Sequence, residues 1–215
     1  MIFFAGLVVF LLLQTAEAGI GNSSESSFCT ETNECLLFEL VCQNEDYEVR
    51  HYDSLKWVST NASSYFVDLS FMNSFRRLFK YLTGSNEDGA NLDMTAPVVI
   101  KLNKKASFWQ PHVYTMSFLL PSKYQKNPPK PTDDKVYFNH MSEMKVYVTS
   151  YGGWMLSSVA KRQAERLADL LDDAGAKYNH EYSYIVGYDS VMKLFNRHNE
   201  VWYEVEGEPV CPADN

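Results

Sequence analysis

Two segments of the chain repeat the same order of hydrophobic and polar positions. Residues 56–60 and 145–150 alternate between the two types, which is typical of half-buried strands. A stretch with helical spacing follows each of them, over residues 67–82 and 156–174. The pattern therefore predicts two strand–helix units of similar length.

Each predicted helix is followed by two runs of hydrophobic, β-branched or aromatic residues, and each unit is opened by a short alternating run. The later runs cover residues 95–102, 113–120, 182–188 and 200–205, and the opening runs cover 47–52 and 136–140. These patterns predict an α+β protein with eight strands and two main helices, built from a duplicated β-α-β-β unit. Because neither unit can bury a sheet face alone, we expect the two to share one core.

The first 18 residues are set apart from this pattern. Residues 2–13 are apolar but too few to span a bilayer comfortably, and residues 16–18 read Ala-Glu-Ala, which suits a signal peptidase. We expect a signal peptide over residues 1–18, with a retained anchor as the competing interpretation. No second apolar run is long enough to cross a membrane, so no stable membrane insertion is expected after cleavage.

The mature chain then divides into three parts. Residues 19–45 form a cysteine-containing extension, residues 46–206 the main domain, and residues 207–215 a short tail. Export would also make two glycosylation sequons usable, at Asn22 and Asn61.

Four cysteines lie at the edges of the predicted domain: Cys29, Cys35, Cys42 and Cys211. In an oxidising compartment an even number of cysteines predicts two disulfides, for which three pairings exist. We favour a Cys42–Cys211 disulfide that links the two ends of the domain and a Cys29–Cys35 disulfide that closes a small loop. Metal binding is disfavoured because there is no Cys-x-x-Cys spacing and no histidine nearby in the sequence.

Charge and motifs narrow the class of function. The chain has 27 acidic and 19 basic residues, a net charge of −8, which is a poor balance for binding nucleic acid. It contains no Gly-x-Ser-x-Gly elbow and no glycine-rich phosphate loop, and its five histidines are scattered. We therefore expect a binding protein rather than an enzyme.

The first predicted helix carries the best candidate site. Met72, Phe75 and Phe79 recur at helical spacing beside the cations Arg76 and Lys80. Such a face can form the wall of a groove for a flat apolar ligand, with the cations at the rim holding carboxylates. The alternative is an ordinary core face flanked by solvated cations.

The loop before the last predicted strand repeats this pairing of a soft apolar residue with a cation, at Met192 and Lys193.

Several short motifs then point to a family. They are Tyr47-Glu48-Val49-Arg50-His51-Tyr52, Lys56-Trp57-Val58-Ser59-Thr60, Met94-Thr95-Ala96-Pro97-Val98, Pro128-Pro129-x-Pro131, Gly187-Tyr188 and Asn199-Glu200-Val201-Trp202. In order and spacing they make residues 46–206 resemble the SOUL family of haem-binding proteins.

This resemblance implies a distorted eight-stranded antiparallel β-barrel with two helices, an effector-binding-like fold. It also implies a groove for haem or a related tetrapyrrole beside the first helix. The residues implied are Met72, Phe75, Arg76, Phe79 and Lys80 on the helix, and Tyr188, Met192 and Lys193 on the facing loop. In some members the histidine matching His51 is thought to ligate the haem iron, so His51 is a candidate iron ligand.

Together with the signal peptide, the resemblance predicts a secreted carrier or scavenger of haem, with haem or porphyrin as its partner. One alternative is a secreted interaction module that kept the fold without the ligand. Another is an enzyme acting on a tetrapyrrole or a small compound. The sequence indicates no particular protein partner.

Overall fold

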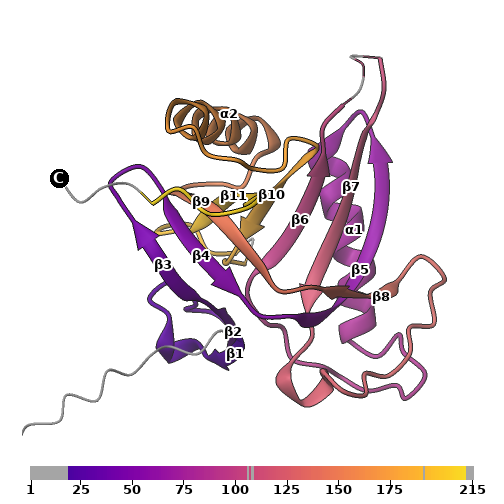
Figure 1. The fold of residues 1–215 in the computed structure, drawn as a ribbon. Coiled ribbons are helices and arrows are strands. Elements are labelled where there is room, and N and C mark those ends of the chain that lie inside the picture. The colour runs from indigo at the N-terminus through magenta and orange to yellow at the C-terminus, as the bar shows by residue number, and fades with distance from the viewer. Residues whose placement is uncertain (1–18, 106, 108, 191, 212–215) are drawn as a thin grey trace, which may run out of the picture.

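The predicted order of strands and helices is present in the computed structural model, which describes residues 19–105, 107, 109–190 and 192–211 (Figure 1). The strands are β1 Gly19–Asn22, β2 Glu34–Leu37, β3 Glu39–Gln43, β4 Glu48–Tyr52, β5 Leu55–Ser64, β6 Val98–Asn103, β7 His112–Leu119, β8 Tyr137–Met141, β9 Met144–Tyr151, β10 Tyr182–Gly187 and β11 Asn199–Glu204. The helices are α1 Val67–Leu82 and α2 Ser157–Asp173, with short 3₁₀ turns at Ser23–Glu25 and Ser122–Tyr124. Helix α1 confirms the predicted range 67–82, and α2 is one residue shorter at each end than predicted.

Most of the strands form one antiparallel sheet. Its order is β3-β4-β9-β11-β10-β6-β7-β5-β8, while β1 and β2 pair separately as a two-stranded sheet. The main sheet has β3 and β8 as its two edges, so it is open, and the expectation of a closed eight-stranded barrel is not confirmed. The ninth strand is β3, which comes from the extension and pairs with β4.

The two helices cover the same face of this sheet, each over its own half. Helix α1 packs on β5 and β7, and α2 packs on β9 and β11 (Figure 1). Side chains alternate across the strands, so Ile100 and Ile185 face the helices, whereas Val99 and Val186 belong to a second core on the opposite face. Both faces of the central strands are therefore buried, as the predicted shared core requires.

The extension covers part of the opposite face. Cys35 and Leu36 of β2 are buried in the second core with Trp202 and Tyr52. Cys29 is bonded to Cys35 and Cys42 to Cys211, so the favoured disulfide pairing is confirmed. The apolar run between Cys35 and Cys42 lies in β2 and β3, with Phe38 between the two strands.

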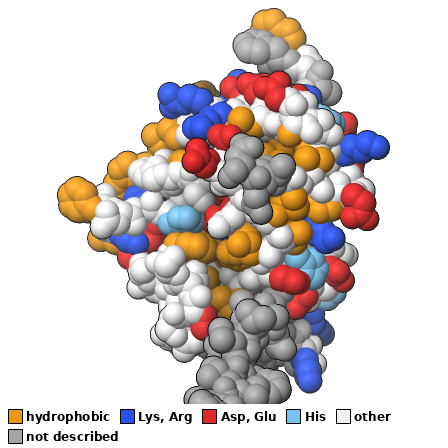
Figure 2. Space-filling model, turned by 60° about the vertical axis from the view of Figure 1, so that its left-hand side comes forward, with side chains coloured by type: hydrophobic (Ala, Val, Ile, Leu, Met, Phe, Trp, Pro, Cys, Tyr) orange, Lys and Arg blue, Asp and Glu red, His pale blue; other side chains and the backbone are white. Residues whose placement is uncertain are grey.

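The predicted signal peptide, residues 1–18, lies outside the described residues. Among the residues that the structure describes, no helix has the length and hydropathy needed to cross a membrane. Figure 2 brings the side carrying β3 and β4 to the front, and hydrophobic side chains there are interspersed with acidic and basic ones.

Candidate functional site

The apolar residues predicted on the first helix form a stripe that is open to solvent. Met72 is 54% exposed and Phe79 is 44% exposed, whereas Phe75 between them is half-buried. The Phe75 ring stacks on Phe79, with centroids 5.9 Å apart, and meets the edge of Phe118 in β7 at 5.1 Å. The stripe therefore has a half-buried middle at Phe75, with the exposed side chains of Met72 and Phe79 on either side of it along the helix.

Asp68 shows where one end of this stripe lies. It precedes Met72, Phe75 and Phe79 by four, seven and eleven residues, so all four lie on one side of α1. Its carboxylate accepts bonds from the backbone N–H of Ser157 at 2.9 Å and from its hydroxyl at 3.1 Å. The N-terminal end of the stripe therefore lies beside the first residue of α2.

The segment that joins β9 to α2 contributes further apolar side chains. Met155 is half-buried in the same core as Phe75 and Val98, and Trp154 is half-exposed next to it. A Cβ added at Gly187 would lie 2.7 Å from the Met155 sulfur, so glycine at this position makes room for Met155. We use the name α1 groove for the candidate surface made of this stripe and the segment that carries Trp154 and Met155.

The cations predicted beside this stripe differ in their exposure and in their partners. Arg76 and Lys80 are both exposed on α1. Arg77, the third cation of this helix, donates to the Thr60 hydroxyl at 2.8 Å and lies 3.8 Å from Asp133. Arg76 and Lys80 are therefore better placed than Arg77 to meet the acid groups of a ligand.

The predicted loop residues are placed less uniformly. Met192 is 81% exposed. The Lys193 ammonium is 2.5 Å from Asp189 Oδ1 and donates to the Thr30 hydroxyl at 3.0 Å, so it already has partners within the protein. Tyr188 is buried in the second core, on the face opposite α1, and this placement does not support contact with a ligand in the groove.

Tyr188 belongs instead to a buried polar cluster around Glu200. The carboxylate of Glu200 is fully buried and accepts from Tyr188 at 3.1 Å and from the Trp202 indole at 2.7 Å. It also lies 2.9 Å from Arg50 Nη1 and 2.6 Å from His198 Nε2. Three motifs quoted from the sequence thus meet at one carboxylate.

The electrostatics of this cluster favour an ionised glutamate. Burial by itself raises the pKa of Glu200, but the charge of Arg50 and the bond from His198 outweigh it, and the pKa lies below its usual value. Burial, together with the charge of Glu200, raises the pKa of Tyr188 well above its usual value. Tyr188 therefore remains a hydrogen-bond donor, and the cluster is a satisfied structural network.

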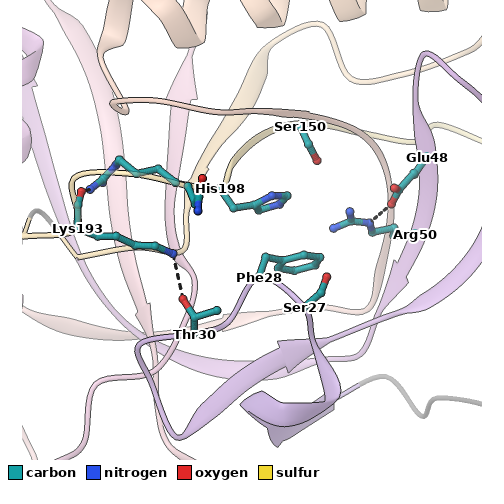
Figure 3. A pocket seen from close by; sticks show the side chains of 10 residues that line it. Ser27, Phe28, Thr30, Glu48, Arg50, Ser150, Lys193 and His198 are labelled. Atoms are coloured by element: carbon teal, nitrogen blue, oxygen red, sulfur yellow. Dashed lines mark hydrogen bonds and ion pairs between the residues drawn. The ribbon is translucent and has the colours of Figure 1, made fainter.

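A pocket of about 710 Å³ opens beside this cluster, where the extension meets the main domain. Figure 3 shows Arg50 and His198 pointing toward its centre from opposite sides, with the Phe28 ring beneath them. Phe28 stacks on His198 with centroids 4.3 Å apart and nearly parallel planes, and Phe38 lies under the Arg50 guanidinium at 4.0 Å. Glu48 and Glu200 both pair with Arg50, so the arginine charge is already balanced inside the protein.

The remaining predicted residues lie elsewhere. His51 is in β4, which is separated from β7 by four strands of the sheet, and α1 packs on β5 and β7. Its ring nitrogens lie 3.0 Å from Glu143 and 3.5 Å from Glu39. This placement keeps His51 away from the α1 groove.

The two sequon asparagines are both exposed. Asn22 caps the first 3₁₀ turn, and Asn61 accepts bonds from Thr115 and Tyr137 through its side-chain oxygen. Glycosylation at these positions stays a prediction. Within the described part of the chain, no three His, Cys, Asp or Glu side chains are grouped so as to hold a metal ion.

Sequence reasoning missed Asp68, Trp154 and Phe28 as contributors to these surfaces. Asp68 carried a usable signal, since a carboxylate one turn before Met72 shares its helix face. Trp154 and Phe28 carried none, because their neighbours are distant in sequence.

Comparison with known proteins agrees with the fold and the quoted motifs. The family model described as SOUL heme-binding protein matches residues 33–204. Human heme-binding protein 2 is 35% identical over 167 residues, covering 78% of this chain and 82% of that protein. Heme-binding protein 1 of Xenopus tropicalis is 34% identical over 158 residues, covering 73% and 82%.

Among solved structures, the C-terminal domain of EcmrR has a TM-score of 0.58 at 11% identity, covering 80% of this chain and 99% of that one. A structure described as a hydrolase from Listeria innocua has a TM-score of 0.52 at 9% identity, covering 77% and 94%. At such identities these two show a shared fold alone. The family model and the relatives show more: the chain belongs to the SOUL heme-binding protein family.

Proposed function

We propose that this protein binds haem, or a related tetrapyrrole, in the α1 groove, and that it acts as an exported carrier or scavenger. The observation that carries the proposal is the stripe of Met72, Phe75 and Phe79 on α1, in which Met72 and Phe79 are open to solvent. Exposed apolar side chains of this size, bordered by cations, are typical of a binding site. Family membership supports a tetrapyrrole as the flat ligand.

The chemistry of the side chains gives each part of the groove a different role in binding. The stripe on α1 would bury one face of the macrocycle, while Arg76 and Lys80 would pair with the propionates at the rim. No described histidine lies among the groove residues named above, so we propose binding without an axial histidine from His51. Burial at about 25 cal/mol per Å², reduced by association costs, is compatible with micromolar-class affinity, about −8 kcal/mol.

Export is supported by the residues at the chain ends. Two disulfides are typical of proteins that fold in an oxidising compartment. Cleavage after Ala18 would leave Gly19, the first residue of β1, as the mature N-terminus. Expression in secretory cells, followed by N-terminal sequencing of protein from the medium, tests this point.

A haemin titration of the oxidised mature protein tests the binding. We expect a saturable shift of the Soret band at one equivalent. Phe79→Ala should weaken binding about ten-fold, the loss that corresponds to roughly 1.4 kcal/mol of buried apolar contact. Leu40→Ala is the matched control, since Leu40 is also 44% exposed but lies on β3 at the sheet edge.

Two results would contradict the proposal. Absorbance changes that never saturate would argue for an interaction module without a tetrapyrrole site. An equal loss of affinity in Phe79→Ala and Leu40→Ala would show that haemin associates with apolar surface in general.

A further inference from the structure

The described residues of the loop between β10 and β11, 188–190 and 192–198, are held together by side chains of the loop itself. Arg197 donates from Nη1 to the carbonyls of Ser190 at 2.6 Å and Lys193 at 2.7 Å. Asp189 accepts from the backbone N–H of His198 at 2.6 Å. These bonds make the described residues of the loop a compact unit that can be positioned as a whole.

On one side this loop adjoins the α1 groove. The Arg197 guanidinium lies over the Trp154 ring, 4.7 Å from its centroid. Trp154 is next in the chain to Met155, which packs in the same core as Phe75. A shift of the loop would therefore act on Trp154, one of the residues of the α1 groove.

On its other side the loop is held by the extension. Glu31 accepts from the backbone N–H of Ser190 at 2.6 Å. Thr30 accepts from the Lys193 ammonium at 3.0 Å, and Phe28 stacks on His198. All three contacts come from four consecutive residues of the extension.

The Cys29–Cys35 disulfide fixes this segment to the domain. Thr30 and Glu31 lie inside the small ring that the disulfide closes. Cys29 and Cys35 are both buried in the second core, so the ring is anchored at both ends. Residues 28–31 also precede the part of the chain that matches the family model, which begins at residue 33.

We propose that residues 28–31, held by the Cys29–Cys35 disulfide, position the 188–198 loop beside the α1 groove and thereby lengthen the residence of a bound flat ligand. The ligand part of this inference rests on the proposed function, whereas the loop part does not. Thr30 and Glu31 are positioning residues, since they act through the loop and make no contact with the ligand.

The loop part is tested first, in the ligand-free mature protein. Glu31→Leu should speed the amide hydrogen exchange of Ser190 by about ten-fold or more, because it removes a charged acceptor from that N–H. Glu31→Gln keeps an acceptor oxygen and should restore much of the protection. Cys29→Ser combined with Cys35→Ser should speed exchange in the same loop while Cys42–Cys211 stays closed.

Glu34→Leu is the matched control. Glu34 also lies in the extension and also accepts from a backbone N–H and a hydroxyl, both of Ser122. Its loss should leave the exchange of Ser190 unchanged. Equal effects of Glu31→Leu and Glu34→Leu on Ser190 would overturn the proposal, because they would indicate general loosening of the extension.

The ligand part is tested by the dissociation rate of haemin, measured by transfer to an excess of an apo-globin acceptor. Glu31→Leu should raise the rate several-fold and leave the association rate nearly unchanged, because affinity differences between related complexes lie mostly in the dissociation rate. A faster Ser190 exchange with an unchanged haemin dissociation rate would overturn the link between loop and groove. If the wild-type protein fails to bind haemin, the proposed function and the ligand part both fall, and the exchange data alone decide the loop part.

Discussion

Arg50 of β4 and Glu200 of β11 form a buried ion pair, with Nη1 2.9 Å from Oε1 and side chains that are 2% and 0% exposed. The two residues are 150 positions apart, and β9 lies between their strands. A buried pair of this kind stabilises little relative to apolar substitutes, but losing one partner leaves an unpaired charge. The ion pair therefore connects β4 of the first repeat to β11 of the second repeat, on the face of the sheet opposite the helices.

Glu200→Gln should therefore lower the free energy of unfolding by about 3–5 kcal/mol, since Arg50 then keeps its charge without its buried partner. Urea denaturation monitored by tryptophan fluorescence measures the change. Glu48→Gln is the matched control, since Glu48 also pairs with Arg50 but is one-third exposed, and its loss should cost less. An equal loss of unfolding free energy in the two variants would contradict the argument that burial of Glu200 makes its loss more destabilising.

The lowered pKa of Glu200 predicts acid sensitivity. A carboxyl with a lower pKa in the folded state binds fewer protons there than in the unfolded state, so its contribution is fully present above the unfolded pKa of about 4.3. That contribution is lost as the pH falls through the folded pKa. The difference in unfolding free energy between wild type and Glu200→Gln should therefore shrink below about pH 4. A difference that stays constant from pH 7 to pH 3 would contradict the assignment.

Asp68→Ala should loosen the start of α2. The α2 N-cap residue, Leu156, provides no side-chain cap, and Asp68 from α1 accepts the Ser157 N–H instead. Loss of a capping carboxylate costs about 1 kcal/mol, and we expect faster amide exchange in the first turn of α2. Asp134→Ala, which removes an exposed aspartate outside both helices, should leave α2 unchanged. Unaltered exchange in Asp68→Ala would show that this cap is dispensable.

His51→Ala should leave the spectrum of the haemin complex unchanged. The ring lies between Glu39 and Glu143 in β4, away from the strands on which α1 packs. Optical and electron paramagnetic resonance spectra of the two complexes make the comparison. Loss of a low-spin signal in His51→Ala would restore His51 as the iron ligand and move the site to that edge of the sheet. An equal change in His112→Ala or His198→Ala would point to a different histidine.

Removal of the Cys42–Cys211 disulfide should lower the free energy of unfolding by about 2–5 kcal/mol, because it closes a loop with a sequence separation of 169. A double change to serine, compared with wild type by denaturation, measures this. Mass spectrometry of unreduced, alkylated protein should find no free thiol. Labelled cysteines in properly exported material would contradict the assignment of two disulfides.

The local elements were predictable because their signals are local. The 3.6-residue period of residues 67–82 predicted α1 at its observed bounds, and period-two alternation located β4, β5 and β9. The cysteine pairing was also predicted, since the positions before the first and after the last predicted strand brought Cys42 and Cys211 together. The exposed stripe of α1 could be named from the same helical period.

What the sequence could not supply depends on contacts between distant segments. Strand pairing decides whether a sheet closes, and here β3 and β8 remain unpaired edges, so the sheet is open. The sequence suggests that the charge of Lys193 is available to a ligand at the rim of the groove. Only the tertiary structure shows that Asp189 and Thr30 already bind its ammonium group. Tyr188 was placed in the groove by its motif, yet strand direction turns it into the opposite core. Periodicity fixes which side of its own element a residue occupies, whereas the partner facing that side is chosen by packing and hydrogen bonding across the whole chain.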